Sequence, residues 1–285
     1  MQTALYGVEL WGGSISLQGW NDFEKLQKGF IRRFMGVKIT TPYSVLLLET
    51  GCLPIEYSGM IRVLRYLQKV KTMPETRLPR QAWVSCSKPK KNYKSKFLVT
   101  GWMLDIRKWF KRWGLEAYLE KDEISWTQFT QDFKSSLWQK WAENEKHTKF
   151  EYYCKNIRGY NRDAFLMEEN TCQTYLTTPM IWRHRSNIAR IRTRSHTLAV
   201  ETGAWIGIPR VARDCQLCTG TQMLEDEEHA LVFCPSYAHI RARFDSLMRT
   251  SDNMNSLLNK SKATLLGKYI TEVLTHREHL LTTNG

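Results

Sequence analysis

Four side chains that can bind a metal ion lie close together in the sequence between residues 215 and 234. Cys215, Cys218, His229 and Cys234 follow the order Cys-x2-Cys-x10-His-x4-Cys. Thiolate sulfur and imidazole nitrogen are the donors of structural zinc sites, in which two close pairs of ligands hold one tetrahedral ion. The pattern therefore predicts a structural zinc ion with four protein ligands and no catalytic role. The competing interpretation is a set of buried cysteines beside an ordinary histidine.

Other polar residues near this motif allow more than one interpretation. The acidic stretch at residues 224–229 either pairs with the arginines that precede it or orients His229 through a hydrogen bond to its ring. His184 and His196 lie in an Arg-rich segment, where a histidine is more often a partner of phosphate or carboxylate than a metal ligand. His239 is a distant alternate to His229.

The chain has a formal net charge of +14, from 42 basic and 28 acidic residues, which favours a polyanionic partner such as nucleic acid. Residues 77–112 contain eleven Lys or Arg and one acidic residue, and a second Arg-rich segment covers residues 181–199. These cations either only keep the surface soluble or contact the phosphates of a nucleic acid. The predicted nucleic-acid-binding residues are Lys90, Lys91, Lys94, Lys96, Arg107, Lys108, Lys111, Arg112, Arg183, Arg185, Arg190, Arg192 and Arg194.

Apolar residues recur mainly at helical spacing, which predicts a mainly α protein with a multi-helix N-terminal unit and a helical C-terminal unit that includes a small zinc-binding module. The predicted domains are a helical segment at 1–86, a basic linker at 87–96, a Trp-rich helical region at 97–178, and a last region at 179–285. This last region contains the basic helix, the zinc module and the C-terminal helices.

Individual helices are predicted from apolar spacing and from the residues that cap them. A helix from Asn21 to Gly36 is expected to bury Phe23, Leu26, Phe30 and Phe34. Further helices are expected at 41–51, 55–73, 102–114, from 125 onward, at 181–199, after 235 and at 262–280. The tryptophans of the helices at 102–114 and after 125 are interpreted as core, with base stacking as the alternative.

Several strings of this sequence resemble the C-terminal part of non-LTR (LINE-type) retrotransposon reverse transcriptases. They are LYGVELWGG (5–13), FIRRFMGVKITTP (30–42), LETGCLP (48–54), RTRSHTLAVETG (192–203) and the strings CQLC, EDEEH and FCPSY of the metal motif. The resemblance covers both ends of the chain, whereas little is recognised between 84 and 170. It implies a thumb-like segment at 1–86, a Cys-Cys-His-Cys zinc-binding tail, and binding of element RNA and target DNA during target-primed reverse transcription.

Polymerase chemistry in that family uses a pair of aspartates that hold Mg²⁺, and no Asp-Asp pair occurs in this sequence. We therefore expect a binding protein without enzymatic activity of its own. Its expected partners are RNA and DNA and possibly the remainder of the polymerase, with neither a membrane nor a small-molecule substrate. Family analogy implies a nuclear or cytoplasmic location. Two alternatives stay open: a zinc-stabilised protein–protein adaptor with a Trp-rich helical interface, and an enzyme whose site is not recognised.

Overall fold

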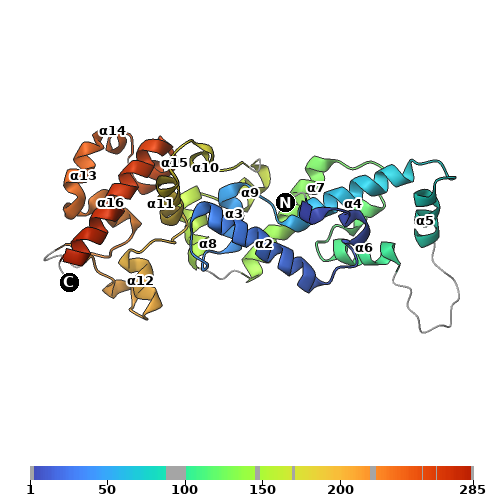
Figure 1. Cartoon of the computed structure of the whole chain (residues 1–285), viewed down its shortest axis with the longest axis horizontal. Helices are drawn as coiled ribbons and strands as arrows, with labels where there is room; N and C mark the ends of the chain where they lie inside the picture. The colour runs from blue at the N-terminus through green and yellow to red at the C-terminus, as the bar shows by residue number, and fades with distance from the viewer. Residues whose placement is uncertain are drawn as a thin grey trace. The chain divides into compact units, whose positions relative to one another are not determined.

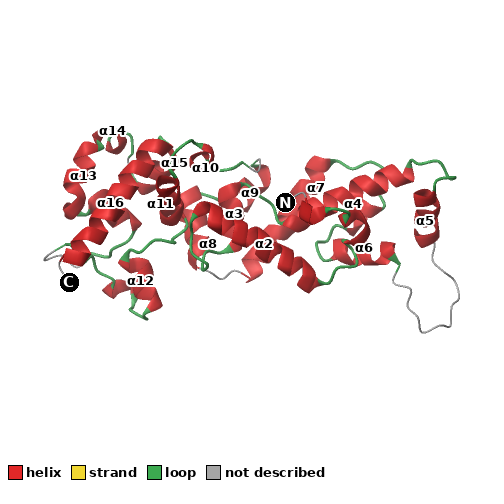
Figure 2. Cartoon of the chain, viewed as in Figure 1, coloured by secondary structure: helices red, strands yellow, loops and turns green. Residues whose placement is uncertain are grey.

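The structure is a computed structural model that describes residues 3–87, 101–144, 148–168, 171–218, 223–251, 253–260 and 262–283. About 71% of it is helical, and no strand forms within these ranges (Figure 2). Asp214 and Leu224 form an isolated antiparallel bridge. The predicted mainly α fold is therefore confirmed. No helix in the described ranges is long and apolar enough to cross a membrane.

The helices form two compact units, each assembled from separate stretches of the chain. Unit 1 comprises Met1–Lys28, Leu53–Glu145 and Arg162–Glu168, and unit 2 comprises Gly29–Cys52, Lys146–Asn161 and Glu169–Gly285. These units do not coincide with the ranges 1–86, 87–96, 97–178 and 179–285 expected from the sequence. The reason is that helices from distant parts of the chain share each core.

Unit 1 is built around stacked aromatic rings. Its helices are η1 (Thr3–Leu5), α1 (Val8–Trp11), α4 (Ile55–Lys71), α5 (Leu78–Ser87), α6 (Trp102–Lys111), η2 (Glu116–Leu119), α7 (Trp126–Asn144) and α9 (Arg162–Met167) (Figure 1). Trp20 stacks on Trp109 with ring centroids 4.7 Å apart, and Trp113 stacks on Phe133 at 4.4 Å. The rings of Trp109, Trp113 and Phe133 are buried, as the helical spacing predicted.

Helix α2 (Leu17–Met35) begins in unit 1 and ends in unit 2, and here the sequence prediction was partly wrong. The helix ends before Gly36 as expected, but it begins at Leu17 and not at Asn21. Its buried face consists of Trp20, Gln27, Ile31 and Met35, whereas Leu26 and Phe30 are each 67% exposed. Gln27 occupies the buried face because its amide donates to the carbonyl of Leu53 and accepts from the amide of Ile55.

Unit 2 contains the metal-binding motif and most of the shorter helices. These are α3 (Tyr43–Thr50), α8 (Thr148–Tyr152), η3 (Tyr153–Arg158), α10 (Thr174–Thr177), α11 (Trp182–Arg192), α12 (Ala199–Trp205), η4 (Arg210–Ala212), η5 (His229–Phe233), η6 (Pro235–Tyr237), α13 (Ala238–Arg243), α14 (Asp245–Met248), α15 (Met254–Lys260) and α16 (Ala263–Thr283). The helix expected at 181–199 is interrupted after Arg192, and the helix expected after Pro235 is divided into η6, α13 and α14.

Helices α11 and α16 lie side by side and form the centre of unit 2 (Figure 1). Their backbones approach closely at Gly267, where an added Cβ would lie 2.8 Å from the Cβ of His184. Thr271 of α16 is hydrogen-bonded to Nδ1 of His184 at 2.9 Å and accepts from the amide of Asn187 at 3.1 Å. This polar contact inside an apolar interface fixes the register of the two helices.

Candidate metal centre

The four predicted ligands converge in unit 2. One ligand atom from each of Cys215, Cys218, His229 and Cys234 lies within 4.8 Å of all the others. The Cys218 Sγ is 3.3 Å from Nε2 of His229 and 3.5 Å from Sγ of Cys234, and the Cys215 and Cys234 sulfurs are 4.0 Å apart. No covalent bond joins these cysteines. Three sulfurs and one imidazole nitrogen around a common point can hold a metal ion.

A short paired segment positions the first two cysteines. The amide of Cys215 donates to the carbonyl of Met223 at 2.8 Å, beside the bridge between Asp214 and Leu224. The amide of Cys218 donates back to the carbonyl of Cys215, so the chain turns and both sulfurs face the same side. Ser236 closes the turn from outside by donating its hydroxyl to the carbonyl of Leu217 at 3.0 Å.

A π-helical turn, η5, positions the other two ligands. In an α-helix, two residues five positions apart point about 140° away from each other, given 3.6 residues per turn. Here the amide of Cys234 donates to the carbonyl of His229 at 2.7 Å, which is the wider i to i+5 pattern of a π-turn. The wider turn brings His229 and Cys234 to one side, and Asp226 caps its start by accepting from the amide of His229 at 2.9 Å.

The site is enclosed by protein. Cys215, His229 and Cys234 are buried, and Cys218 is partly exposed. Burial raises the pKa of the Cys215 thiol to about 12 and lowers the pKa of His229. The Nδ1 atom of His229 is buried without a hydrogen-bond partner among the described residues, while Nε2 faces the sulfur of Cys218. A neutral imidazole turned towards three sulfurs suits a cation, which would also displace the thiol protons.

The acidic stretch next to His229 pairs with arginines on both sides of it in the sequence. Glu227 bonds to the preceding Arg194, which was one of the two alternatives drawn from the sequence, and Glu225 bonds to the later Arg277. Glu225 accepts two hydrogen bonds from Arg277 of α16, at 2.6 and 2.7 Å, and one from the amide of Ala199 at 2.7 Å. The predicted hydrogen bond from this stretch to the ring of His229 is not formed in the described residues, since Nδ1 has no partner there. Glu225 thus ties the metal motif to α12 and α16.

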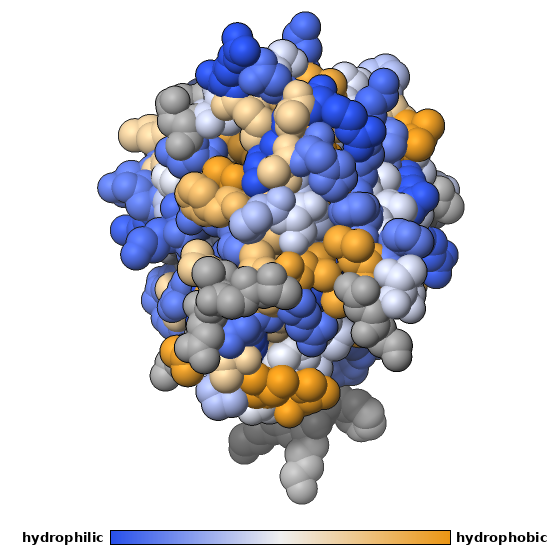
Figure 3. All heavy atoms as spheres, turned by 90° about the vertical axis from the view of Figure 1, so that its left-hand side faces the viewer, coloured by the Kyte–Doolittle hydropathy of each residue, from blue (hydrophilic) through white to orange (hydrophobic). Residues whose placement is uncertain are grey.

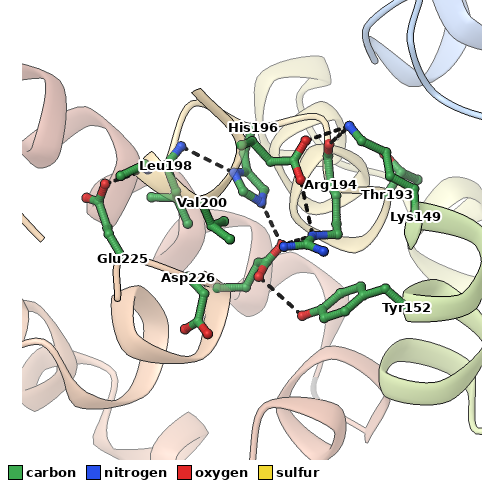
Figure 4. Close-up of polar contacts among 12 residues, drawn as sticks. Lys149, Tyr152, Thr193, Arg194, His196, Leu198, Val200, Glu225 and Asp226 are labelled. Carbon is green, nitrogen blue, oxygen red and sulfur yellow. Dashed lines mark hydrogen bonds and ion pairs between the residues drawn. The ribbon is translucent and has the colours of Figure 1, made fainter. Parts of the chain in front are cut away.

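Glu227 forms a second anchor, and its partners Tyr152, Arg194 and His196 are labelled in Figure 4. It accepts hydrogen bonds from Arg194 at 3.0 Å, from His196 at 2.8 Å and from the hydroxyl of Tyr152 at 3.2 Å. Burial opposes ionisation of Glu227, but the charges and hydrogen bonds of His196 and Arg194 outweigh it and lower its pKa to about 2. The neighbouring Glu201 pairs with Lys149 at 2.6 Å and with Arg194 at 3.3 Å.

The remaining histidines near the motif are not part of the cluster. His196 pairs with a carboxylate, as its Arg-rich surroundings suggested, and His184 is bonded to Thr271. His239 lies against His276 with ring centroids 4.8 Å apart and is not among the clustered ligands.

Three of the predicted nucleic-acid-binding residues of unit 1 project from α6. Arg107, Lys108 and Lys111 are exposed, and the first two have carboxylate neighbours, Glu120 at 2.7 Å and Asp105 at 3.8 Å. Arg112 instead folds towards the buried Glu56 and bonds to it at 2.9 Å. Lys90, Lys91, Lys94 and Lys96 lie outside the described residues.

The predicted basic residues of unit 2 fall into two groups. Arg183 is exposed, and Arg185 and Arg190 are partly exposed. Arg192 is only 1% exposed, with its guanidinium 2.5 Å from Glu49, and Arg194 is 6% exposed between Glu201 and Glu227. Arg192 and Arg194 therefore do not belong to the nucleic-acid surface expected from the sequence, because buried carboxylates already occupy their donors.

Two further residues near this surface, Lys38 and Trp182, carried no functional prediction. Lys38 belongs to a string used only for the family resemblance, and its amide donates to Ser195 at 2.6 Å, 157 positions away. Trp182 is 54% exposed at the first position of α11. The position of this tryptophan at the start of an Arg-rich helix is the feature of the sequence that could have indicated a role at the surface.

Comparison with protein-family models, with curated proteins and with solved structures yields no match to this chain.

Proposed function

We propose that the cluster of Cys215, Cys218, His229 and Cys234 holds a structural zinc ion. Zn–S bonds of about 2.3 Å and a Zn–N bond of about 2.0 Å, arranged tetrahedrally, separate two sulfurs by roughly 3.8 Å and a sulfur from a nitrogen by roughly 3.5 Å. Three separations in the cluster are 3.5 and 4.0 Å between sulfurs and 3.3 Å between sulfur and nitrogen, and all pairs of ligand atoms lie within 4.8 Å. Four protein donors leave no coordination position for a substrate.

We further propose that the protein binds nucleic acid and corresponds to the C-terminal region of a non-LTR retrotransposon reverse transcriptase. The observation that carries this proposal is the connection between the metal motif and a basic helix. Glu227, two residues before His229, holds Arg194, which lies two residues after the end of α11. The metal thereby fixes the helix that presents Arg183 and Arg190, and the net charge of +14 supplies the attraction for a polyanion.

The alternative adaptor function has weaker support. It relies on tryptophans that present an interface, yet Trp20, Trp109, Trp113 and Trp141 are each at most 6% exposed and pack inside unit 1. On the face that carries the C-terminal helices, hydrophobic side chains occur in small patches between hydrophilic ones (Figure 3). Scattered patches of this kind are ordinary on a protein surface and do not favour a large apolar interface on that face.

Elemental analysis of protein purified without added metal tests the zinc proposal. We expect about one zinc per chain in the parent and loss of zinc in the variant Cys215→Ser with Cys234→Ser. Replacing Cys52 and Cys172, which lie outside the cluster, by Ser is the matched control and should leave the zinc content unchanged. A metal other than zinc, or no metal, would contradict the proposal.

Binding measured against salt concentration tests the nucleic-acid proposal. Phosphate contacts predict that log K falls linearly with log salt, with a slope of about 0.9 per neutralised phosphate of a duplex. Replacing the exposed Lys108 and Lys111 of α6 by Ala should lower that slope by about two such contacts. The control variant replaces the exposed Lys25 and Lys69 by Ala and removes the same charge outside the predicted surface. Absence of salt-dependent binding to any RNA or DNA would refute the function.

A further inference from the structure

Unit 2 contains a cavity of about 580 Å³ beside the exposed start of α11. This volume lies within the range of about 300–1,000 Å³ typical of small-ligand sites. The cavity is bounded by the turn after α2, the first half of α11, the segment 195–197 and the end of α16. The neutral residues Gly36, Trp182, Asn187 and Thr275 are among those that line it.

Positive charge dominates this cavity. Lys38, Arg183 and Arg190 line it together with one carboxylate, that of Glu278. The ammonium of Lys38 donates to the carbonyl of His196 at 2.7 Å and lies 3.8 Å from the ring centroid of Trp205, so none of its closest contacts is an anion. Burial lowers the pKa of Lys38, and the charges of Lys149 and Arg190 lower it further against the opposing effect of Glu201. Cations crowded in this way would be stabilised by a bound anion.

The arginines are held in place by neutral groups, which leaves their charge available. Arg190 donates its Nε to the carbonyl of Gly36 at 2.8 Å and its Nη1 to the side chain of Asn187 at 3.4 Å. Arg183 donates to the hydroxyl of Thr275 at 3.1 Å. These hydrogen bonds orient both guanidinium groups without neutralising them. A phosphate is the anion that such planar donors bind best.

An exposed indole forms another part of the wall. The ring of Trp182 packs over Gly36, where an added Cβ would lie 2.8 Å from its Cζ2. Gly36 also has a φ of +70°, a conformation that favours glycine and allows the chain to turn beneath the ring. Packing against the backbone fixes the plane of the indole, while 54% of the side chain stays exposed. A fixed, exposed aromatic ring is a stacking surface for a base.

We infer that this cavity binds one nucleotide of a single-stranded nucleic acid, with its phosphate beside Lys38, Arg183 and Arg190 and its base stacked on Trp182. The inference rests on the proposed nucleic-acid function and assigns a place for contact with an unpaired nucleotide. The base must be unpaired, because a base inside a duplex is already stacked on both faces and cannot lie against an indole. Stacking and phosphate contact depend little on base sequence. The site therefore distinguishes single strands from duplexes and does not select a particular base.

The test measures fluorescence anisotropy of the metal-loaded full chain with a labelled single-stranded RNA of about 12 nucleotides, within the site sizes of single-strand binders. The same sequence as single-stranded DNA and as an RNA duplex provides the other probes. Loss of one stacked base, worth about 1–3 kcal/mol, predicts that Trp182→Ala raises Kd for the single strands about tenfold. The duplex affinity should change little. Trp182→Phe retains a ring and should recover most of the loss, and Arg183→Gln should lower the salt slope by about 0.7.

Two control variants make the same chemical changes away from the cavity. Phe30→Ala removes an aromatic ring that is 67% exposed, and Arg249→Gln removes a guanidinium that is 79% exposed. Both should bind like the parent, and the melting temperature of Trp182→Ala should also match the parent. If the parent binds no probe, the proposed function itself is wrong. If the parent binds but Trp182→Ala and Arg183→Gln behave like the controls, or if Trp182→Ala weakens duplex and single strand equally, the cavity is not the site although the function stands.

Discussion

Units 1 and 2 both bury glutamates, but with opposite electrostatic results. In unit 1, the Glu56 carboxylate accepts from the indoles of Trp109 and Trp113 and from Arg112. Burial nevertheless raises its pKa, and burial together with the charge of Glu56 raises the pKa of Glu24 to about 7. In unit 2, the pKa of the more deeply buried Glu227 is lowered to about 2. Depth of burial therefore does not decide the protonation of these acids.

The deciding factor is the balance of neighbours around each carboxylate. At Glu24, burial and the charge of Glu56 outweigh the charges of Lys140, Lys28 and Arg112. Indole N–H groups are neutral donors, and Glu56 shares the charge of Arg112 with the nearby Glu24. Glu227 instead receives hydrogen bonds from both Arg194 and His196. A buried charge is tolerated only where the partners outweigh its desolvation. Unit 2, which contains the metal motif, meets that condition at Glu227, and unit 1 does not meet it at Glu24.

The largest expected difference between the units is their response to metal removal. Apparent binding energies of structural zinc reach roughly 10–16 kcal/mol, which exceeds the stability of most domains. Chelation should therefore unfold the segment from α12 to α14 and release Glu225 and Glu227 from their arginines, while α4, α6 and α7 of unit 1 stay folded. Hydrogen exchange measured by peptide should show loss of protection in residues 199–248 only.

Re-addition of zinc should restore that protection, which controls for irreversible damage by the chelator. Equal loss of protection in both units would mean that the metal stabilises the whole chain. Unchanged protection of residues 199–248 would mean that the ion pairs of Glu225 and Glu227 hold this segment without a metal.

The next largest effect is expected from the buried ion pair between Glu49 and Arg192. Glu49 is 0% exposed and accepts from Arg192 and from the hydroxyls of Tyr153 and Tyr175. Arg192→Met leaves this carboxylate without its cation and should destabilise unit 2 by about 3–5 kcal/mol in denaturant unfolding. Arg243→Met removes an exposed arginine paired with Glu272 and should cost at most about 1 kcal/mol. Equal losses of unfolding free energy in the two variants would show that the buried Glu49–Arg192 pair stabilises the protein no more than the exposed Glu272–Arg243 pair.

Features that depend on local sequence were predictable. Helices α3 and α4 begin directly after Pro42 and Pro54, and α6 ends shortly before Gly114, as expected from their caps. The metal cluster was predictable because all four ligands lie within one 20-residue stretch. Its π-turn was not, since the spacing of His229 and Cys234 does not distinguish a π-turn from other ways of bringing them together.

Features that depend on distant partners could not be predicted. The buried face of α2 was missed because Gln27 interrupts its apolar pattern, and the groups that satisfy Gln27 lie at Leu53 and Ile55. Arg192 was interpreted as a phosphate ligand because charge is visible in a sequence, whereas its partner Glu49 is 143 positions away. Charge alone therefore does not tell a surface arginine from a buried one.

The smallest of the three effects is a pH dependence of unit 1 that originates at Glu24. Its pKa in the folded protein, about 7, lies above the ordinary glutamate value of 4.5, so the protonated form favours folding. The contribution of Glu24 to the free energy of unfolding of unit 1 should be fully present below pH 4.5 and should be lost as the pH rises to about 7. The loss is about 2 kcal/mol after allowance for the partial exposure of Glu24. Denaturant unfolding of unit 1 at several pH values measures it.

Glu24→Gln should remove most of this decrease, with the remainder coming from Glu56, whose pKa is also raised. It should make unit 1 more stable than the parent at pH 8, because burial and repulsion by Glu56 outweigh the attraction of Lys140, Lys28 and Arg112 for the charge of Glu24. Glu123→Gln, at an exposed position of the same unit, should reproduce the pH profile of the parent. If Glu24→Gln instead destabilises unit 1 at pH 8, the charge of Glu24 is compensated in the fold by Lys140 and Arg112. The two units would then treat their buried acids alike, and the contrast drawn between Glu24 and Glu227 would not hold.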